Sequence, residues 1–567
     1  MPLRRQRLAP RALRQRPRLA LAPLALAFSL FAPQAAAQTT PVETGSGVVQ
    51  GLPLGARNGV GALGEADGRV FAGPRLVVFA PDGSPRFVGD NAAFTPPVSG
   101  EARAFSIAAR PGGRVVVGLG FTDLTDPDDP VSAAAGFAVS DDGGATWASR
   151  PAPLDAATAT TVRYGASTLP ASPIFTAAGA APFGVAVDPA SGAIYSANDL
   201  AGLRVSTDDG RTWRRVVLPP DTLDRITPEA AYAFPYAPAG VQLPGATDPR
   251  EVSFFGFNFI AYSVLVDEEG TVWAGTLAGL NRGDAGTVDP ASGDRAWVRY
   301  GPDRARPGPA GGFVVALEAR EIDGARDEVW AATWPSGRDA ALAPEAADER
   351  FGVTVWRGDT SDGEPVFETL LLGERVYDLA FRGETVYAAG QNGLFISPDG
   401  GAAWRSVRVF RDAGGAVLPI RPGTAVFSVT VSDGGEVYAG TGDGLLRSAD
   451  GGETWTLFRA SVPNAPDPPT DEAPEAEAYA YPNPFSPRTD RLARIRFELD
   501  APADVRVRVF DFAMRLVAEI DAGGRPAGAN EVLWTGTADG ARVANGAYVY
   551  VVDAGDDQLS GKILVLD

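Results

Sequence analysis

A phrase of about fifty residues recurs along most of this chain, and it limits the fold more than any other feature of the sequence. The phrase begins with an alternating apolar strand, passes a polar turn and reaches a second strand of the type Val-Tyr/Trp-Ala-Gly. It ends in a hairpin that contains Ser, Asp, Gly and Trp. The clearest copy runs from Phe427 to Trp455, and the copy before it runs from Val376 to Trp404.

Seven candidate copies can be counted from the second strand of the phrase. These strands begin at Val70, Val115, Ile194, Val272, Val329, Val386 and Val437. Each copy predicts about four short strands with period-2 alternation, and one such sheet cannot bury both of its faces alone. A radial arrangement buries sheet against sheet and leaves only short edges. The sequence therefore predicts an all-β fold, with a roughly seven-bladed β-propeller over residues 41–460; six or eight blades remain alternatives.

Four hairpins in the repeat share the pattern Ser-x-Asp-x-Gly-x-Thr-Trp, and only Ala403 departs from it. An Asp side chain can accept hydrogen bonds from turn N–H groups, Gly can take a positive φ, and the Trp ring can pack between blades. We therefore interpret these residues as structural. They are Ser140, Asp142, Gly144, Thr146 and Trp147; Ser206, Asp208, Gly210, Thr212 and Trp213; Ser397, Asp399, Gly401 and Trp404; and Ser448, Asp450, Gly452, Thr454 and Trp455.

On these hairpins, residues of about 100–460 resemble the BNR/Asp-box propeller superfamily, which includes sialidases, glucan hydrolases, sortilin-like receptors and photosystem assembly factors. In that superfamily the boxes lie away from the active site. The resemblance to sialidases stops at the boxes, because the chain has no aromatic-Arg-Ile-Pro motif. Arg225-Ile226 lacks both the aromatic residue before it and the Pro after it. No catalytic residue can be carried over, so the catalytic residues are unknown at this stage.

Two loops offer candidate ligand sites. The segment of about 220–259 is rich in aromatic residues, and Tyr232, Phe234, Tyr236 and Phe257 are candidates for stacking on a sugar or peptide. The alternative, a small satellite core under a long loop, is the one that the pattern favours.

The second loop carries the carboxylates of Asp123, Asp126 and Asp128. Oxygen ligands suit calcium, but the spacing does not follow an EF-hand loop. A solvated acidic loop is therefore favoured over a calcium site, and we predict no other metal or cofactor.

A different pattern follows the propeller. Residues 461–478 are rich in Pro and acidic residues and read as a linker. Residues 479–567 contain alternating strands that predict a small Ig-like β-sandwich. The YPNPF opening at Tyr481–Phe485, the strand ending in Val509-Phe510-Asp511 and the final Gly561-Lys562 strand resemble type IX secretion C-terminal sorting domains and the FlgD-type Ig-like fold. Ala513-Met514-Arg515 departs from that family, which often has Gly in this turn.

The N-terminus and the composition bear on location and chemistry. Residues 1–37 combine an Arg-rich start, a short apolar run and Ala35-Ala36-Ala37, the order expected of a cleaved signal peptide, and no later stretch is apolar enough to span a membrane. The formal net charge of −20 disfavours nucleic acid as a partner. The chain has no Cys and no His, which excludes disulfides, Ser-His-Asp catalysis and His- or Cys-ligated zinc.

Together these features predict a secreted or surface-attached protein. The leading interpretation is a propeller that binds and displays a polysaccharide or a surface protein, while residues 479–567 engage secretion and sorting machinery. The alternative is a secreted glycoside hydrolase, sialidase-like or glucanase-like, that works with carboxylates. A surface assembly factor is a third interpretation. The hydrolase requires two carboxylates that face each other over the central channel, which the sequence alone does not reveal.

Overall fold

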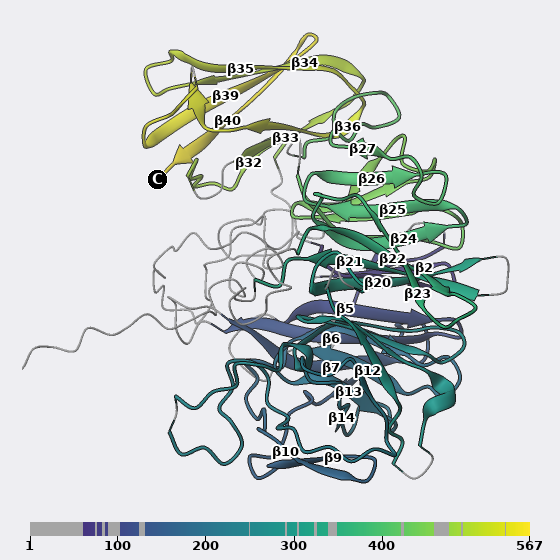
Figure 1. Ribbon diagram of the computed structural model, residues 1–567. Coiled ribbons are helices and arrows are strands. Elements are labelled where there is room, and N and C mark those ends of the chain that lie inside the picture. The colour runs from purple at the N-terminus through teal and green to yellow at the C-terminus, as the bar shows by residue number, and fades with distance from the viewer. Residues whose placement is uncertain are drawn as a thin grey trace, which may run out of the picture.

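The computed structural model of the chain describes residues 60–566, apart from 74–75, 82–84, 89–101, 124–130, 249, 290–291, 303–305, 323–325, 338–348, 421–423, 459–475, 489–491 and 539. The described chain is built almost wholly of antiparallel strands, arranged as seven sheets in a ring and a separate β-sandwich (Figure 1). The all-β prediction and the count of seven blades are confirmed. The expected signal peptide lies outside the described residues.

Six of the seven blades are four-stranded meanders with their strands in sequence order. Blades 1 to 3 consist of β1 (Leu63–Ala66), β2 (Arg69–Ala72), β3 (Val77–Phe79) and β4 (Pro85–Phe87); β5 (Arg103–Arg110), β6 (Arg114–Asp123), β7 (Val131–Ser140) and β8 (Ala148–Arg150); and β11 (Pro182–Val187), β12 (Ile194–Asn198), β13 (Gly202–Ser206) and β14 (Arg214–Arg215). A hairpin of β9 (Thr161–Tyr164) and β10 (Ser167–Pro170) is inserted between blades 2 and 3.

Blade 4 differs from the others by a fifth, outer strand. It consists of β16 (Ala261–Val266), β17 (Val272–Thr276), β18 (Gly279–Gly283), β19 (Trp297–Tyr300) and the outer β15 (Arg225–Ile226), with short 3-10 turns η2 (Phe257–Phe259) and η3 (Ala285–Thr287) nearby. Blades 5 to 7 consist of β20 (Phe313–Ile322), β21 (Arg326–Trp334), β22 (Gly352–Asp359) and β23 (Pro365–Leu370); β24 (Val376–Arg382), β25 (Thr385–Gly390), β26 (Gly393–Ser397) and β27 (Arg405–Val407); and β28 (Val426–Val431), β29 (Val437–Thr441), β30 (Gly444–Ser448) and β31 (Thr456–Phe458).

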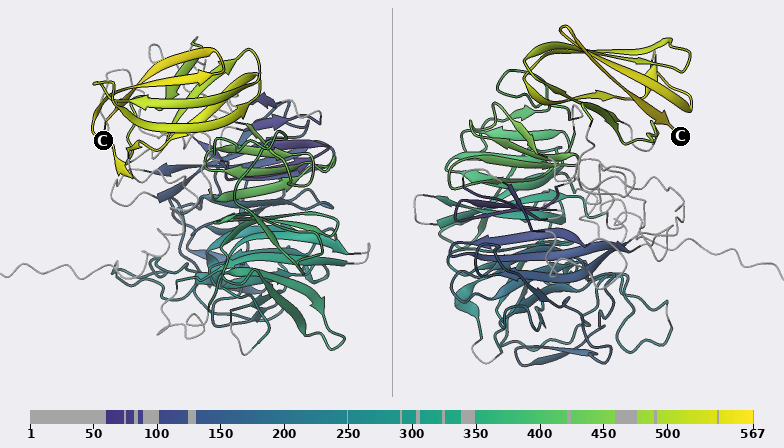
Figure 2. Two further views of the ribbon diagram at one scale, coloured as in Figure 1. Left: turned by 90° about the horizontal axis from the view of Figure 1, so that it is seen from above. Right: turned by 180° about the vertical axis from the view of Figure 1, so that it is seen from behind.

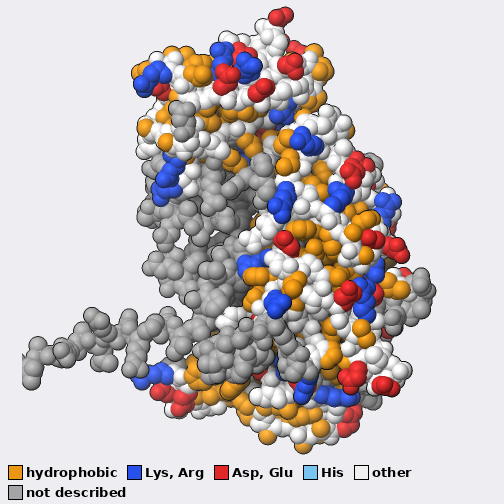
Figure 3. All heavy atoms as spheres, turned by 45° about the horizontal axis from the view of Figure 1, so that its top comes forward, with side chains coloured by type: hydrophobic (Ala, Val, Ile, Leu, Met, Phe, Trp, Pro, Cys, Tyr) orange, Lys and Arg blue, Asp and Glu red, His pale blue; other side chains and the backbone are white. Residues whose placement is uncertain are grey.

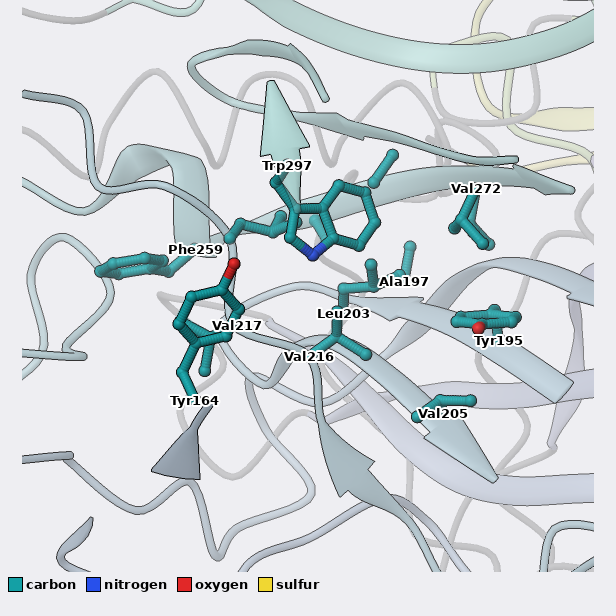
Figure 4. Close-up of a cluster of buried hydrophobic side chains, with 14 of the residues drawn as sticks. Tyr164, Tyr195, Ala197, Leu203, Val205, Val216, Val217, Phe259, Val272 and Trp297 are labelled. Atoms are coloured by element: carbon teal, nitrogen blue, oxygen red, sulfur yellow. The ribbon is translucent and has the colours of Figure 1, made fainter. Parts of the chain in front are cut away.

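The core of the propeller lies between neighbouring blades. One apolar cluster fills each interface around the ring, including the interface between blades 7 and 1. The aromatic residue of the repeated second strand belongs to these clusters: Trp273 and Trp330 are fully buried, and Tyr438 packs against Phe79 of blade 1. Figure 4 shows the cluster between blades 3 and 4, where Trp297 and Phe259 meet side chains of β12 and β13. The aromatic residue of the repeated phrase is therefore a residue that packs between blades.

Because neighbouring strands run in opposite directions, successive connections lie on opposite faces of the ring. The turns between first and second strands and between third and fourth strands lie on one face, which we call the hairpin face. The connections between second and third strands and between successive blades lie on the other, which we call the long-loop face. The insertions over residues 151–181 and 216–260 belong to the long-loop face.

The C-terminal sandwich has its own core. One sheet contains β32 (Ala478–Tyr481), β33 (Ala493–Leu499) and β36 (Gly528–Trp534), and the other contains β34 (Ala503–Phe510), β35 (Leu516–Arg525), β39 (Gly546–Ala554) and β40 (Asp557–Val565); β37 (Thr537–Ala538) and β38 (Ala541–Arg542) form a small hairpin. Phe485 of the YPNPF opening is buried against the ring of Trp534.

One ion pair joins the sandwich to the propeller. Arg494 of β33 pairs with Asp443, which lies in the turn between β29 and β30, and the guanidinium also lies over the Tyr481 ring. Elsewhere on the face shown in Figure 3, acidic and basic side chains are interspersed over both parts of the molecule. Figure 2 shows the sandwich beside the ring from two further directions.

Candidate functional site

The first strands of the seven blades surround a central channel of about 870 Å³. Each first strand contacts the first strand of the next blade, and β28 contacts β1, so the wall is continuous. A cavity of this size lies in the range of small-molecule sites. The channel is therefore the principal candidate site of the propeller.

Six of the seven first strands carry a β-bulge near the long-loop face. The bulged residues are Phe105, Phe183, Tyr262, Val315, Tyr377 and Phe427. A bulge turns its extra residue out of the normal alternation, here toward the end of the channel. Five of the six are aromatic, and together with Phe313 and Trp334 they form a chain of rings with centroids 4.5–5.6 Å apart. We call these seven rings the aromatic collar.

Blade 1 leaves a gap in the collar. The Ser428 hydroxyl donates to the carbonyl oxygen of Val60, just as that of Ser263 donates to Val314, the residue before a bulge. Val60 is thus the counterpart of Val314, and Gly61 occupies the position that carries a ring in five other blades. A Cβ atom at Gly61 would meet no described atom within 4 Å. The collar is consequently open at this blade.

In four blades, the side chain of the residue after the bulge joins its blade to the next one. Ser106, Ser263 and Ser428 donate hydrogen bonds to backbone carbonyl groups of the following blade. Gly184 and Ala316 stand at this position in two further blades and have no polar side chain. Asp378 fills the same role as the three serines: its carboxylate accepts the N–H of Val429 at 2.9 Å and that of Leu379 at 3.0 Å. Burial nevertheless raises the pKa of Asp378 to about 7.

Glu318 lines the channel one step deeper, three residues beyond the bulge of β20. Burial, and then the nearby Asp378 carboxylate, raise the pKa of Glu318 to about 8. Among the residues that the structure describes, none donates a hydrogen bond to the Glu318 carboxyl group. Its side chain is half-buried and lines the open channel, so the carboxyl group can be reached from the channel. Glu318 is accordingly a carboxyl group of the channel wall that is available to a ligand.

Neither Glu318 nor Asp378 stands out as a site residue in the sequence alone. One local signal was present: Glu318 is the first charged residue in the first strand over Phe313–Ile322, after five apolar residues. That signal could not be separated from the many other acidic residues until the first strands were aligned on their bulges. Asp378 could not be recognised as an inter-blade contact, because none of its counterparts after the other bulges is acidic.

The four Ser-Asp-Gly-Trp hairpins connect third strands to fourth strands and so lie on the hairpin face. In the first, Asp142 accepts the N–H of Thr146 at 2.8 Å and its hydroxyl at 2.6 Å, while the Ser140 hydroxyl accepts the N–H of Gly144. The hydrogen bond from the Thr146 hydroxyl, followed by that from its N–H, lowers the pKa of Asp142 to about 2.

The other three hairpins repeat this geometry. Asp208, Asp399 and Asp450 accept the N–H groups of Thr212, Ala403 and Thr454 respectively. Two of the Trp rings pack against the preceding blade or the segment that follows it. The ring centroid of Trp213 lies 4.6 Å from that of Phe137, and the ring centroid of Trp455 lies 5.4 Å from that of Phe410. The Asp carboxylates are therefore used within their own hairpins.

The four rings singled out for ligand binding lie largely in packing interfaces. Tyr236 is buried, and Tyr232 and Phe234 are partly buried against the core between blades 3 and 4. Phe257 is partly buried against the core between blades 5 and 6. This arrangement corresponds to the satellite core, the alternative that the sequence favours, and a ligand role for these four rings stays a prediction.

Two neighbouring rings in the same insertion are exposed instead. The side chains of Phe254 and Phe255 are 59% and 53% exposed. They precede a turn in which the Asp221 carboxylate accepts the N–H groups of Gly256, Phe257 and Asn258. Asn258 is itself buried and bonded to Asn281 and Thr276 of blade 4. The two rings are thus presented on a turn that is fixed to the propeller.

The proposed calcium loop is described only at one end. Asp123 ends β6, whereas Asp126 and Asp128 lie outside the described residues. Within the described ranges, no group of three or more acidic side chains could hold a metal ion. Over those same ranges, no helix is long and apolar enough to cross a membrane.

Residues 485–558 match the FlgD Ig-like domain family. No curated protein sequence matches the chain. Solved structures with similar architecture include a GH74 enzyme from Niastella koreensis, at 12% identity and a TM-score of 0.44, with 90% of this chain and 73% of that chain covered. PorZ, a surface component of the type-IX secretion system of Porphyromonas gingivalis, is 13% identical, with a TM-score of 0.33 and coverage of 90% and 82%.

The extracellular domain of a one-component system of B. thetaiotaomicron is also 13% identical, with a TM-score of 0.39. The comparison covers 90% of this chain but only 57% of that protein, so the chain spans little more than half of its length.

Proposed function

We propose that this protein is an exported propeller, attached to the cell surface through its C-terminal domain, that binds a polysaccharide or a protein on its long-loop face and displays it. The observation that carries this proposal is the presentation of Phe254 and Phe255. Two adjacent exposed rings on a fixed turn form a surface on which a ligand can stack. Because the turn is already ordered, binding costs little conformational entropy. Aromatic rings of this kind suit the apolar faces of sugars and the side chains of proteins.

The arrangement of carboxyl groups supports binding over hydrolysis. A glycoside hydrolase needs two carboxyl groups on either side of the scissile bond. In the channel, both oxygens of Asp378 accept backbone N–H groups, and Glu268 at the channel mouth is paired with Arg110. Among the described residues, Asp378 is the one carboxylate that raises the pKa of Glu318, and both of its oxygens are already used.

The binding experiment uses the mature chain, residues 38–567, on glycan and surface-protein arrays. We expect binding that the double variant F254A/F255A loses. Phe512, which is 89% exposed on the sandwich, provides a matched control, because F512A removes an exposed ring from the other domain. Equal losses of binding in both variants, or no loss of binding in the double variant, would rule out the long-loop face as the binding surface.

A hydrolase remains a second candidate because of Glu318. A carboxyl group with a pKa of about 8 is protonated at neutral pH and could serve as a general acid. Asp378, with a pKa of about 7, would then have to act as its partner in spite of its two backbone hydrogen bonds. Turnover of a glycoside by the wild type that E318Q abolishes would establish this second candidate.

The sorting role of the C-terminal domain rests on the YPNPF opening, the strand pattern and the FlgD-type match over residues 485–558. Deletion of residues 476–567 should leave the propeller folded, because the seven inter-blade clusters contain no residue of the sandwich. We expect the truncated protein to accumulate inside the outer membrane, whereas the full chain reaches the cell surface. Surface display that is unaffected by the deletion would rule out a sorting role.

A further inference from the structure

We propose that the central channel binds a primary alkylammonium group, with its nitrogen at Glu318 and its carbon chain directed toward the aromatic collar. This site is separate from the exposed rings of the long-loop face, and it stands or falls independently of the function proposed for that face. Three properties of the channel support it: the net charge of its wall, the surroundings of Glu318, and the change in polarity along its length.

The wall of the channel is strongly acidic. Seven carboxyl groups line it, and the guanidinium of Arg110 is the one cation among the described lining residues. Arg110 is already occupied, since it donates to the carbonyl oxygens of Val187 and Val266 and pairs with Glu268. A concave wall of one sign concentrates the field inside it and attracts ions of the opposite sign. The channel therefore favours a cation over a neutral molecule or an anion.

The surroundings of Glu318 place that cation within the channel. Counted from the bulges, the residues at the level of Glu318 in five other blades are uncharged: Ala108, Ala186, Leu265, Ala380 and Thr430. Glu318 is thus the one acidic group at this level among those six strands. An ammonium group brings three N–H donors and a positive charge. It would supply the hydrogen bonds that no described residue gives to this carboxyl group, and it would reduce its repulsion with Asp378.

The polarity of the channel changes from one end to the other. Five of the acidic residues, Glu65, Asp267, Glu268, Glu269 and Glu321, lie at the mouth on the hairpin face, whereas the collar lies at the opposite end. Glu318 is three residues from the collar level, which is about 10 Å along a strand. An alkyl chain of about six carbons spans most of this distance and would contact Ala380, Leu265 and the rings of the collar. A cation with an apolar tail is thereby oriented with its tail toward the collar.

The test compares three probes of equal length on the mature chain at pH 9, above the pKa of Glu318 and below that of an alkylammonium group: n-hexylamine, n-hexanol and hexanoate. By titration calorimetry, hexylamine should bind with a dissociation constant of about 1 mM or tighter, and the alcohol and the acid should not bind measurably. Binding of hexanol as tight as that of hexylamine would overturn the proposal, and so would the absence of hexylamine binding. This comparison needs no variant and does not depend on how a variant folds.

Two variants locate the site. E318Q should weaken hexylamine binding by about tenfold or more, because it removes the charge and keeps the shape. E498Q makes the same change on the exposed surface of β33 in the sandwich and should leave the affinity unchanged. Circular dichroism confirms that both variants are folded. Hexylamine binding that E318Q leaves unchanged would place the amine elsewhere and overturn the proposal.

A fourth probe distinguishes the source of the ammonium group. Nα-acetyl-lysine methylamide carries the same ammonium group on a lysine side chain, with a peptide unit at its other end. The gap at Gly61 is the place where that unit could pass the collar. Binding of both amines, weakened in E318Q, would indicate that a lysine of a partner protein can occupy the channel. Binding of hexylamine alone would indicate a free amine; both outcomes support the site at Glu318.

Discussion

The hydroxyl group of Ser428 donates a hydrogen bond of 3.1 Å to the carbonyl oxygen of Val60, a residue 368 positions earlier in the chain. Together with the N–H of Val60, which donates to Thr441, this contact joins blade 7 to blade 1. Each described blade is made of consecutive strands, so this ring closes by side-by-side packing and not by exchange of a strand. The hydrogen bond of Ser428 therefore helps to hold blade 7 against blade 1 and so to close the ring.

Replacement of Ser428 by Ala should destabilise the propeller at this seam. The lost hydrogen bond leaves a buried carbonyl oxygen without its donor, at a cost of about 1–3 kcal/mol. Urea unfolding of the mature chain, followed by Trp fluorescence, measures the change in midpoint. S149A, which removes an exposed hydroxyl group from β8, is the control and should leave the midpoint unchanged. A midpoint for S428A that matches S149A would show that the seam does not depend on this bond.

Asp155 should be among the most sensitive acidic residues of the propeller. Its carboxylate pairs with Arg204 at 2.7 Å and with Arg215 at 2.6 Å, and all three side chains are buried. Asp155→Ala leaves two guanidinium groups buried without an anion, which should lower the free energy of unfolding by about 3–5 kcal/mol. D188A, in an exposed turn of blade 3, is the comparison and should cost far less. Equal losses would contradict the role assigned to the buried pairs.

The pH dependence of the same residue has a definite sign. Although burial opposes it, hydrogen bonding to Arg204 and Arg215 lowers the pKa of Asp155 to about 2. The stability that this carboxylate contributes is fully present above its unfolded pKa near 4, and it is lost as the pH falls through 2. The difference in unfolding midpoint between wild type and D155N should therefore shrink between pH 4 and pH 2. A constant difference over this range would contradict the ionised pairing.

Glu318 should have the opposite pH dependence. Because its pKa is raised to about 8 in the folded protein, the folded state holds this proton more tightly than the unfolded state does. Stability should consequently fall as the pH rises from about 4.5 through 8. E318Q removes this loss, so its melting temperature should match the wild type at pH 5 and exceed it at pH 9. Parallel melting curves at every pH would show that Glu318 does not carry a raised pKa.

Much of the fold follows from the sequence because the repeated phrase contains the packing residues themselves. Trp273 and Trp330 mark second strands, and they are buried because the second strand puts a large ring into an inter-blade interface in six of the seven blades. The hairpins were recognisable because Asp142 and its counterparts make local hydrogen bonds. The candidate site was not predictable in this way. The bulges that place Tyr377 in the collar depend on pairing between strands, and the exposure of Phe254 against the burial of Tyr236 depends on how the insertion folds.

One departure from the family pattern has a structural counterpart. Met514 lies in the turn where FlgD-like domains often have Gly, and its φ is +59°, in the left-handed region that favours glycine. Its side chain is 60% exposed, so little packing is lost by removing it. Met514→Gly should stabilise the protein by about 0.5–1 kcal/mol, whereas M514A, which keeps the unfavourable φ, should not. A destabilised glycine variant would contradict this description of the turn.

The central claim, that the propeller binds a ligand without hydrolysing it, is tested most directly by one screen of the mature chain on glycans. Binding and release of reducing ends are measured on the same samples, for wild type, F254A/F255A and E318Q. We predict binding without turnover, lost in F254A/F255A and retained in E318Q. Turnover by the wild type that E318Q abolishes would contradict the claim and identify the channel as a hydrolytic active site.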